Sequence, residues 1–306
     1  MTFRLKILGS NSAAPAFNRN QTAQVLQVNN SYFLIDCGEG TQLRMGKARV
    51  KINKISHIFI SHLHGDHYFG LIGLISTMHL FGRKHDLDIF CPSPLEEIIN
   101  LQLKHSETVL NFKINYTFID QMEDNHLLEN KNLTVEKFSL NHRIFCSGFL
   151  FRENPKPIRI NKAKIPEDFS VANIGKLKKG EDIYDEDGKL LYKNSDLTLP
   201  PKNSRSYAYC SDTKYDENII PVIKGVDLLY HEATFTNEMK ERADKTYHST
   251  AEQAGKIAKK AETKKLLIGH YSVRYRELEP LLEEARSIFP ETYLAIEGNF
   301  VDVSEY

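Results

Sequence analysis

The order of apolar and polar residues along the chain predicts many strands with helices between them. Phe3-Arg4-Leu5-Lys6-Ile7 alternates apolar and basic side chains, as a half-buried strand does. Two apolar runs flank Asn29-Asn30 and predict a hairpin. The predicted strands are residues 3–7, 23–28, 31–36, 55–60, 87–91, 114–119, 205–210, 226–231, 265–269 and 292–296. The predicted helices are residues 39–48, 66–81, 94–105, 249–261 and 277–288. This pattern indicates an α/β fold.

The stretch from about residue 152 to residue 200 interrupts this pattern. Its apolar residues are sparse, and prolines and glycines recur along it. We interpret it as a flexible, protruding arm inserted into one domain of residues 1–306, because nothing in it predicts a second large core.

Composition excludes several classes of protein. The chain has 306 residues, 41% hydrophobic and 26% charged, which is typical of a globular protein. It has no apolar run long enough for a membrane span, and its N-terminus lacks the pattern of a signal peptide. The four cysteines are scattered, so we expect reduced thiols in a cytoplasmic protein. The net charge of zero argues mildly against nucleic-acid binding.

The segment SHLHGDH at residues 61–67 carries the strongest chemical signal. It follows the apolar run Ile58-Phe59-Ile60 and precedes a helix-like stretch, so it forms a polar turn at the end of a buried strand. His62 and His64 are two residues apart, and an extended backbone directs them the same way. Asp66 and His67 follow as the chain turns and can face a second direction. Imidazole and carboxylate ligands in this arrangement suit two neighbouring metal ions.

Four ligands cannot complete two coordination shells, so further ligands must come from elsewhere. His142, Asp212 and His270 each follow an apolar, strand-like run. Strand ends are rigid positions for a site. Each of the three, taken alone, is more often an ordinary surface residue. They become candidates because the 61–67 segment already indicates metal.

The motif His-x-His-x-Asp-His, followed by a distant His, Asp and His, resembles the metallo-β-lactamase superfamily. The resemblance implies a four-layer αββα sandwich and two zinc ions per chain. It implies that one zinc is held by His62, His64 and His142. It implies that the other is held by Asp66, His67 and His270, and that Asp212 bridges the two.

Segments outside the metal motif resemble one member family, bacterial ribonuclease Z. They are ILGSNSAAPAFNRN (7–20), DCGEGTQ (36–42), PPKNSRSYAYCSDT (200–213), HEATF (231–235), HSTAEQAG (248–255) and GHYSVRY (269–275). Together they cover nearly the whole chain. The sequence departs from the family at Ala16, Phe149 and Ser211, where threonine, tyrosine and glycine are usual, and the arm lacks the usual Gly-Pro pair.

The resemblance implies an endoribonuclease that removes 3′ trailers from precursor tRNA, acting as a homodimer. The arm is in keeping with this, because residues 152–180 hold eight basic and three acidic residues, a net charge of +5. A basic arm can bind phosphates without reading sequence, although an ordinary solvated loop could carry the same charge. The candidate substrate-binding residues are Arg152, Lys156, Lys176, Lys178 and Lys179.

The implied reaction is attack of a metal-generated hydroxide on a phosphodiester, which leaves a 3′-hydroxyl on the tRNA and a 5′-phosphate on the trailer. Asp66 is the candidate proton acceptor. The sequence alone favours a plain residue beside a helix for His248, but the resemblance implies that His248, paired with Glu232, is the general acid. A carboxylate beside an imidazole favours the protonated form of the ring. Ser249-Thr250-Ala251-Glu252 predicts a capping box, which would put His248 just before a helix.

Three alternatives stay open from the residues themselves. The chain could hydrolyse a thioester, a lactam or a small phosphodiester on the same fold. It could be a redox enzyme with two irons, although such proteins usually carry Glu at the position of His64. It could also be an RNA-binding protein with structural zinc, although structural sites are usually closed by Cys and His ligands.

Overall fold

The computed structural model describes residues 2–303. The chain divides into two compact units: the larger comprises Met1–Phe151 and Arg205–Tyr306, and the smaller comprises Arg152–Ser204. In residues 2–303 there is no helix with the length and apolar character that a membrane crossing needs.

The first sheet of the larger unit has seven strands in the order β18-β1-β2-β3-β4-β5-β6. Pairing is antiparallel from β18 to β3 and parallel from β3 to β6. The strands are β1 (Phe3–Gly9), β2 (Ala23–Val28), β3 (Ser31–Cys37), β4 (Ile55–Phe59), β5 (Leu87–Cys91), β6 (Ile114–Phe118) and β18 (Phe300–Asp302). The predicted hairpin is confirmed, because β2 pairs with β3 across Asn29-Asn30.

The second sheet also has seven strands, in the order β17-β16-β15-β14-β9-β8-β7. The strands β14 to β17 are mutually parallel. The strands are β7 (His126–Glu129), β8 (Leu133–Ser139), β9 (Ser147–Glu153), β14 (Ser206–Cys210), β15 (Leu228–Glu232), β16 (Leu266–Gly269) and β17 (Thr292–Leu294).

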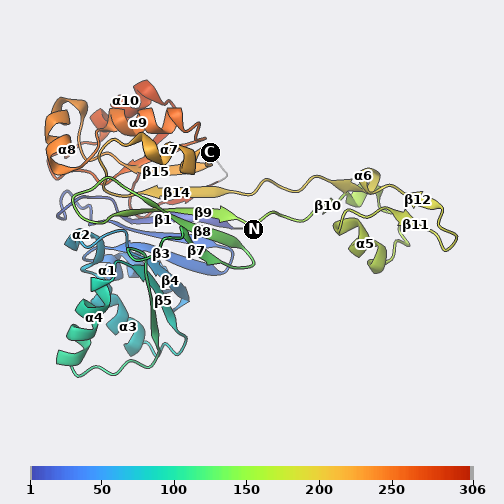
Figure 1. Cartoon of the computed structure of the whole chain (residues 1–306), viewed down its shortest axis with the longest axis horizontal. Coiled ribbons are helices and arrows are strands. Elements are labelled where there is room, and N and C mark those ends of the chain that lie inside the picture. The colour runs from blue at the N-terminus through green and yellow to red at the C-terminus, as the bar shows by residue number, and fades with distance from the viewer. Residues whose placement is uncertain (1, 304–306) are drawn as a thin grey trace. The chain divides into compact units, whose positions relative to one another are not determined.

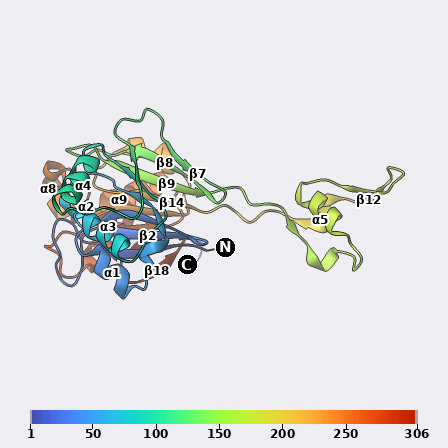
Figure 2. The same cartoon turned by 90° about the horizontal axis from the view of Figure 1, so that it is seen from below.

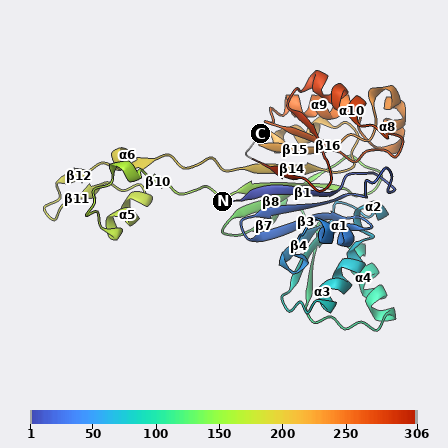
Figure 3. The same ribbon diagram turned by 180° about the vertical axis from the view of Figure 1, so that it is seen from behind.

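Helices cover the outer faces of both sheets, and the two inner faces pack on each other. Figures 1 and 3 show α9 and α10 on one side of the larger unit and α3 and α4 on the other, and Figure 2 shows α1 and α3 from below. Apolar side chains fill three successive interfaces of this stack. The predicted four-layer αββα sandwich is therefore confirmed. The helices of this unit are α1 (Thr41–Lys47), α2 (Gly65–Tyr68), α3 (Leu71–Leu80), α4 (Pro94–His105), α7 (Ile220–Ile223), α8 (Lys240–Thr246), α9 (Ala251–Lys260) and α10 (Glu279–Ile288).

Aromatic rings dominate the layer between the sheets. Phe59 of β4 stacks on Phe90 of β5 with 4.7 Å between ring centroids, and it meets Phe149 and Phe151 of β9 from the opposite sheet. Such rings bury large areas and prefer defined mutual orientations. This interface therefore fixes the two sheets, and with them the loops at the strand ends, in one relative position.

The prediction of one helix over residues 66–81 is wrong, because the helix is interrupted after Tyr68. The backbone N–H of Gly70 donates to the carbonyl of Cys37 at 2.9 Å instead of continuing the helical ladder. A Cβ at position 70 would lie 2.2 Å from the carbonyl oxygen of Gly38, so only glycine allows this approach. The break holds the metal-motif turn against the end of β3.

The predicted capping box is also shifted by one residue. Thr250 is the N-cap of α9: its hydroxyl accepts from the N–H of Gln253, and the Gln253 side chain accepts from the N–H of Thr250. Ser249 does not cap the helix, because its hydroxyl donates to the carbonyl of Thr213 at 2.7 Å. This bond ties the segment before α9 to the loop that follows β14.

The smaller unit has its own apolar centre. Leu177, Ile183 and Leu197 are buried together, with Ile160 and Phe169 packed against them. The elements of this unit are β10 (Arg159–Ile160), α5 (Val171–Lys178), β11 (Ile183–Tyr184), β12 (Leu190–Tyr192), α6 (Asn194–Leu197) and β13 (Thr198–Leu199). The strands pair as β10 with β13 and β11 with β12.

Candidate metal centre

The carboxyl ends of strands from both sheets supply the clustered side chains. The 61–67 segment follows β4, His142 follows β8, Asp212 follows β14 and His270 follows β16. Parallel strands end at a common edge of a sheet, and binding sites form there in α/β proteins. The seven predicted ligand residues, His62, His64, Asp66, His67, His142, Asp212 and His270, all lie in this cluster.

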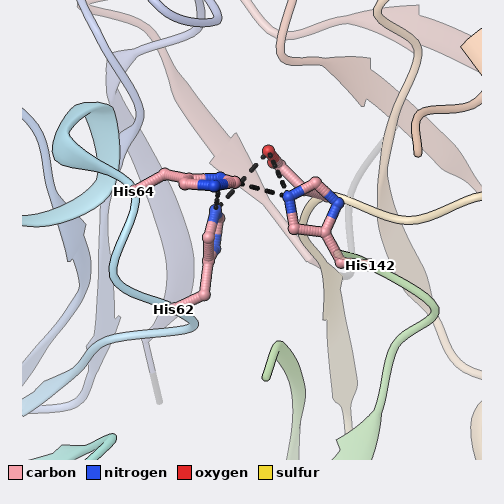
Figure 4. Close-up of side chains that lie close together, drawn as sticks. His62, His64 and His142 are labelled. Carbon is pink, nitrogen blue, oxygen red and sulfur yellow. Dashed lines mark hydrogen bonds and ion pairs between the residues drawn. The ribbon is translucent and has the colours of Figure 1, made fainter. Parts of the chain in front are cut away.

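One group of donor atoms comprises three imidazoles and a carboxylate. His62 Nε2 and His142 Nε2 each lie 3.1 Å from His64 Nδ1, and Figure 4 shows the three rings directed at a common point. Asp212 Oδ2 lies 3.6 Å from His62 Nε2 and 3.9 Å from His142 Nε2. The four donor atoms therefore surround a single small volume.

A second group comprises Asp66, His67 and His270. Asp66 Oδ2 lies 3.5 Å from Nε2 of each of the two histidines. Asp212 Oδ1 lies 3.3 Å from His67 Nε2 and 3.1 Å from His270 Nε2. The two oxygens of Asp212 thus face different groups, as a carboxylate that bridges two ions would.

In two imidazoles of the first group, His62 and His142, the nitrogen that faces away from the group has a hydrogen-bond partner. His142 Nδ1 donates to the carbonyl of Tyr247 at 3.0 Å. His62 Nδ1 lies 3.0 Å from Ser61 Oγ, which itself donates to Asp36 at 2.9 Å, so the Ser61 oxygen accepts from His62. These bonds keep the proton on Nδ1 and leave the Nε2 lone pairs directed into the cluster.

Asp36 is the shared anchor of both groups, although the sequence analysis did not select it. Its carboxylate accepts from His67 Nδ1 at 2.8 Å, from the backbone and hydroxyl of Ser61, and from the Tyr209 hydroxyl at 2.6 Å. Asp36 is fully buried and orients His67 directly and His62 through Ser61. Partners of this kind fix the ring orientation of metal-binding histidines.

Two of these positions have left-handed backbone conformations. Asp36 has φ of 53° and occupies a bulge in the pairing of β2 with β3, and His270 has φ of 60° directly after β16. Residues other than glycine rarely adopt this conformation, which the surrounding structure must impose. The fold therefore holds both side chains at a local energetic cost, as functional sites often do.

The electrostatics of the first group favour ligand protonation states, whereas in the second group burial lowers the pKa of His67 but Asp212, Asp66 and Asp36 hold it well above its ordinary value. Burial holds the pKa of His62 well below its ordinary value, and burial also lowers the pKa of His64 and of His142, so these rings stay neutral. Burial alone would raise the pKa of Asp212, but His270, His67 and His62 hold it well below its ordinary value. Neutral imidazoles and an ionised carboxylate are the forms that bind metal.

His248 and Glu232 form a pair beside the cluster. His248 Nδ1 donates to Glu232 Oε1 at 2.8 Å. Burial lowers the pKa of His248, but Glu232 and then Asp212 and Asp66 raise it to about 9. The imidazole is therefore protonated at neutral pH. Thr234 connects this pair to the cluster, because its hydroxyl donates to Glu232 Oε2 at 2.7 Å and lies 2.9 Å from His270 Nδ1.

The cluster opens into a cleft of about 530 Å³. Asp66, His248 and His270 line it, together with three exposed arginines, Arg143, Arg242 and Arg274. Within residues 2–303, none of these guanidinium groups has a carboxylate at ion-pair distance. The cleft therefore combines an anion-attracting wall with the metal donors.

Comparison with known proteins identifies the family. The chain is 53% identical over 305 residues to ribonuclease Z of Cytophaga hutchinsonii, a match that covers 100% of this chain and 97% of the relative. The chain belongs to the ribonuclease Z family. The resemblance stated from the motifs is confirmed.

Solved structures agree with this assignment. Human tRNase Z, short form, superposes with a TM-score of 0.70 and 26% identity over 98% of this chain and 99% of that one. The metallo-β-lactamase fold protein YhfI of Bacillus subtilis superposes with a TM-score of 0.69 and 19% identity over 99% of this chain and 100% of that one, which supports the fold alone. A family model described as Anti-Pycsar protein Apyc1 matches residues 3–155. That segment lacks Asp212, His248 and His270, whereas the ribonuclease Z match includes them.

The donor set of this ribonuclease Z chain fits divalent metal. The Nε2 atoms of His67 and His270 are buried and have no hydrogen-bond partner in the described part of the chain, which is costly unless a ligand occupies the space between them. Zinc bonds of about 2.0–2.1 Å place two ligands of a tetrahedral ion roughly 3.3 Å apart. The donor separations of 3.1–3.9 Å in this chain bracket that value.

Sequence reasoning missed the groups that support or extend the cluster. Signals for some of them were present: Asp36 opens the DCGEGTQ segment, Thr234 lies in HEATF and Arg274 lies in GHYSVRY. Arg143 directly follows His142. Arg242, on α8, has no motif that could have marked it.

The five basic residues expected to bind RNA lie in the smaller unit and differ in their surroundings. Lys176, Lys178 and Lys179 are exposed at the C-terminal end of α5, where cations also favour the helix. Lys156 forms an ion pair with Glu153 at 2.6 Å and donates to the carbonyl of Asn203, so its positive charge is partly neutralised. Arg152 is half-buried and is the first residue of the smaller unit, near the end of β9, a strand that begins in the larger unit.

Proposed function

We propose that this chain is a metal-dependent endoribonuclease that removes 3′ trailers from precursor tRNA. The observation that carries the proposal is that the two carboxylate oxygens of Asp212 face different donor groups. Its Oδ2 faces one group and its Oδ1 faces the other. The full-length likeness to proteins named ribonuclease Z supports RNA as the substrate, and the structural likeness to human tRNase Z supports tRNA.

We further propose two zinc ions per chain. His62, His64 and His142 would hold one, Asp66, His67 and His270 the other, and Asp212 both. Imidazole-rich donor sets with carboxylates suit zinc. When bound, two such ions supply hydroxide near neutral pH and stabilise charge on a phosphoryl oxygen.

Asp66 is proposed to orient the attacking oxygen. Its carboxylate borders the cleft and accepts from the N–H of Ala13 at 2.8 Å, which fixes its direction. Burial raises the pKa of Asp66, but His67 and His270 lower it further than burial raises it. The carboxylate is therefore ionised and can accept a hydrogen bond from the nucleophile.

His248 is proposed to protonate the leaving oxygen. Its Nδ1 is held by Glu232, so its Nε2 proton is the one available to the 3′-oxygen of the tRNA. A pKa of about 9 keeps that proton in place at neutral pH. Proton transfer from Nε2 leaves a 3′-hydroxyl on the tRNA and a 5′-phosphate on the trailer.

Substrate binding is proposed to involve two sets of cations. Arg143, Arg242 and Arg274 would bind the phosphates that flank the cut, since all three line the cleft. The smaller unit would act as a flexible arm for the body of the tRNA, through Arg152, Lys156, Lys176, Lys178 and Lys179. The three exposed lysines of α5 are the strongest of these candidates.

We also propose a homodimer in the cytoplasm. Leu43 on α1 is 71% exposed, and Leu80 and Phe81 at the end of α3 are 78% and 66% exposed. The two helices contact each other, so these side chains support an interface between copies. The four cysteines are buried free thiols, which is in keeping with a reducing compartment.

Incubation with a 3′-extended tRNA transcript tests the function. The wild type should cut once at the end of the acceptor stem, and end mapping should find a 3′-hydroxyl and a 5′-phosphate. His248→Ala should slow cleavage by roughly 10²–10⁴-fold, the usual contribution of a general acid, while metal content stays unchanged. His105→Ala, an exposed histidine on α4, is the matched control. Intact transcript after incubation with metal-replete protein would exclude the function.

A further inference from the structure

An exposed aromatic ring lies on the cleft wall next to the metal donors. Phe69 follows α2 directly, lines the cleft and is 59% exposed. Single exposed apolar residues are common on protein surfaces. Phe69 differs from Leu80 or Leu101 in its location, because it borders the same cleft as His64 and Asp66.

The position of the ring is fixed by glycine packing. A Cβ at position 65 would lie 2.2 Å from Cε2 of Phe69, so the ring rests on the backbone of Gly65, between His64 and Asp66. The Tyr68 ring meets Phe69 edge-on, with 5.0 Å between centroids. With one side supported by Gly65 and much of its surface exposed, the ring offers a flat apolar surface at a defined place.

Cations on the same cleft indicate the class of ligand. Arg143, Arg242 and Arg274 line the cleft together with Phe69. Aromatic faces combined with a positively charged groove bind single-stranded nucleic acid, because every base can stack while the phosphates meet the cations. The chemistry of this wall therefore fits an unpaired nucleotide.

His248 and Phe69 line the same cleft but are held by different neighbours. His248, the proposed donor to the leaving 3′-oxygen, packs against His142 and His270. Phe69 packs instead on the turn that carries His64 and Asp66. The ribose that bears the leaving 3′-oxygen lies beside His248 if His248 protonates that oxygen. The first trailer nucleotide, on the other side of the phosphate, would then lie nearer Phe69.

We propose that Phe69 stacks on the base of the first trailer nucleotide, directly 3′ of the cut, and so positions the scissile phosphate. This inference rests on the proposed function. Stacking involves the π-face that all four bases share, so Phe69 recognises the presence of a base there and not its identity.

The test compares two 3′-extended tRNA transcripts, one intact and one abasic at the first trailer nucleotide. Phe69→Ala should lower kcat/KM by about tenfold on the intact transcript, in the range that alanine substitution of a stacking residue gives, and should change it little on the abasic one. Phe69→Tyr should retain the wild-type value. Leu101→Ala, which removes a 53% exposed side chain outside the cleft, is the matched control and should have no effect.

A binding measurement separates stacking from catalysis. 2-Aminopurine at the first trailer position should be quenched on binding to His248→Ala, which holds the transcript uncut, and quenching should be lost when Phe69→Ala is added. Metal content should be the same in all variants. Equal losses on the two transcripts, or quenching that does not depend on Phe69, would overturn the inference. If only an abasic site 5′ of the cut removes the effect of Phe69→Ala, the assigned side is wrong. Absence of cleavage by the wild type would instead overturn the proposed function.

Discussion

The ion pair between His248 and Glu232 should determine how the cleavage rate depends on pH. In Glu232→Gln the side chain keeps its shape but loses its charge, and Glu232 is the largest of the influences that raise the pKa of His248 to about 9. The general acid acts in its protonated form, so the alkaline limb of the kcat profile reports the loss of that proton. We expect the limb at or below pH 9 in the wild type and at clearly lower pH in the variant.

The size of the effect follows from the geometry. The imidazole and carboxylate meet at 2.8 Å, and the side chain of Glu232 is fully buried, so solvent screens the pair little. A limb that moves down by one pH unit corresponds to about 1.4 kcal/mol. The variant rate should then fall about tenfold at a pH above both limbs, whereas titration alone changes it little at pH 7.

A second, pH-independent loss is expected from hydrogen bonding. Each carboxylate oxygen of Glu232 accepts two hydrogen bonds. Oε1 accepts from the backbone N–H of Thr213 and from His248, and Oε2 accepts from the backbone N–H and the hydroxyl of Thr234. A glutamine amide must direct its N–H₂ at one of these pairs of donors. Leaving buried partners unsatisfied costs about 1–3 kcal/mol, so the variant should also be less stable to heat.

The assay is single-turnover cleavage of a 3′-extended tRNA from pH 6 to pH 10, with metal content measured for each preparation. His248→Ala, which has no imidazole to titrate, should lack the alkaline limb altogether. The reasoning is refuted if Glu232→Gln leaves the limb at the wild-type pH, or if His248→Ala retains it.

Substitutions in the cluster and in the smaller unit test the ligands, their support and the binding arm. Asp212→Ala removes the oxygens shared by both donor groups, so metal analysis should find loss of metal. Activity should fall by more than the roughly 10–100-fold that the loss of a residue supporting a ligand costs. Retention of a full metal complement would contradict this. Asp36→Asn keeps a residue type that tolerates positive φ but replaces one acceptor oxygen of the carboxylate that binds His67 and Ser61. Metal affinity should therefore fall roughly 10–100-fold. Unchanged affinity would show that Asp36 does not orient the ligands. Replacing Lys176, Lys178 and Lys179 by glutamine should weaken tRNA binding and reduce its dependence on salt concentration, without affecting hydrolysis of a small phosphodiester. Equal losses on both substrates would argue against a separate binding arm.

Parts of the fold and of the site could be predicted from the sequence because their signals are local, whereas His142, Asp212 and His270 became candidates only beside the 61–67 segment and through the family resemblance. The hairpin around Asn29-Asn30 is encoded by neighbouring residues, as is the His62–His67 turn after its apolar strand. The full-length likeness to ribonuclease Z also counts against the alternatives of a redox enzyme and of a structural zinc protein.

The remaining features depend on contacts between distant segments. Nothing local to Gly70 marks the break between α2 and α3, which follows from its close approach to Gly38. The role of Asp36 depends on a bulge that turns its carboxylate toward the strand end of β4. Arg242 reaches the cleft only through the placement of α8. Such roles are properties of the folded chain, and periodicity cannot indicate them.

In the proposed function, two metal ions held around Asp212 make this chain a nuclease. The most direct measurement is to strip the protein of metal, return zinc in steps, and follow both bound zinc and the rate of trailer removal. Stripped protein should show negligible cleavage, and cleavage should recover as bound zinc approaches two ions per chain. Undiminished cleavage by protein free of metal would show that the reaction does not need the metal ions.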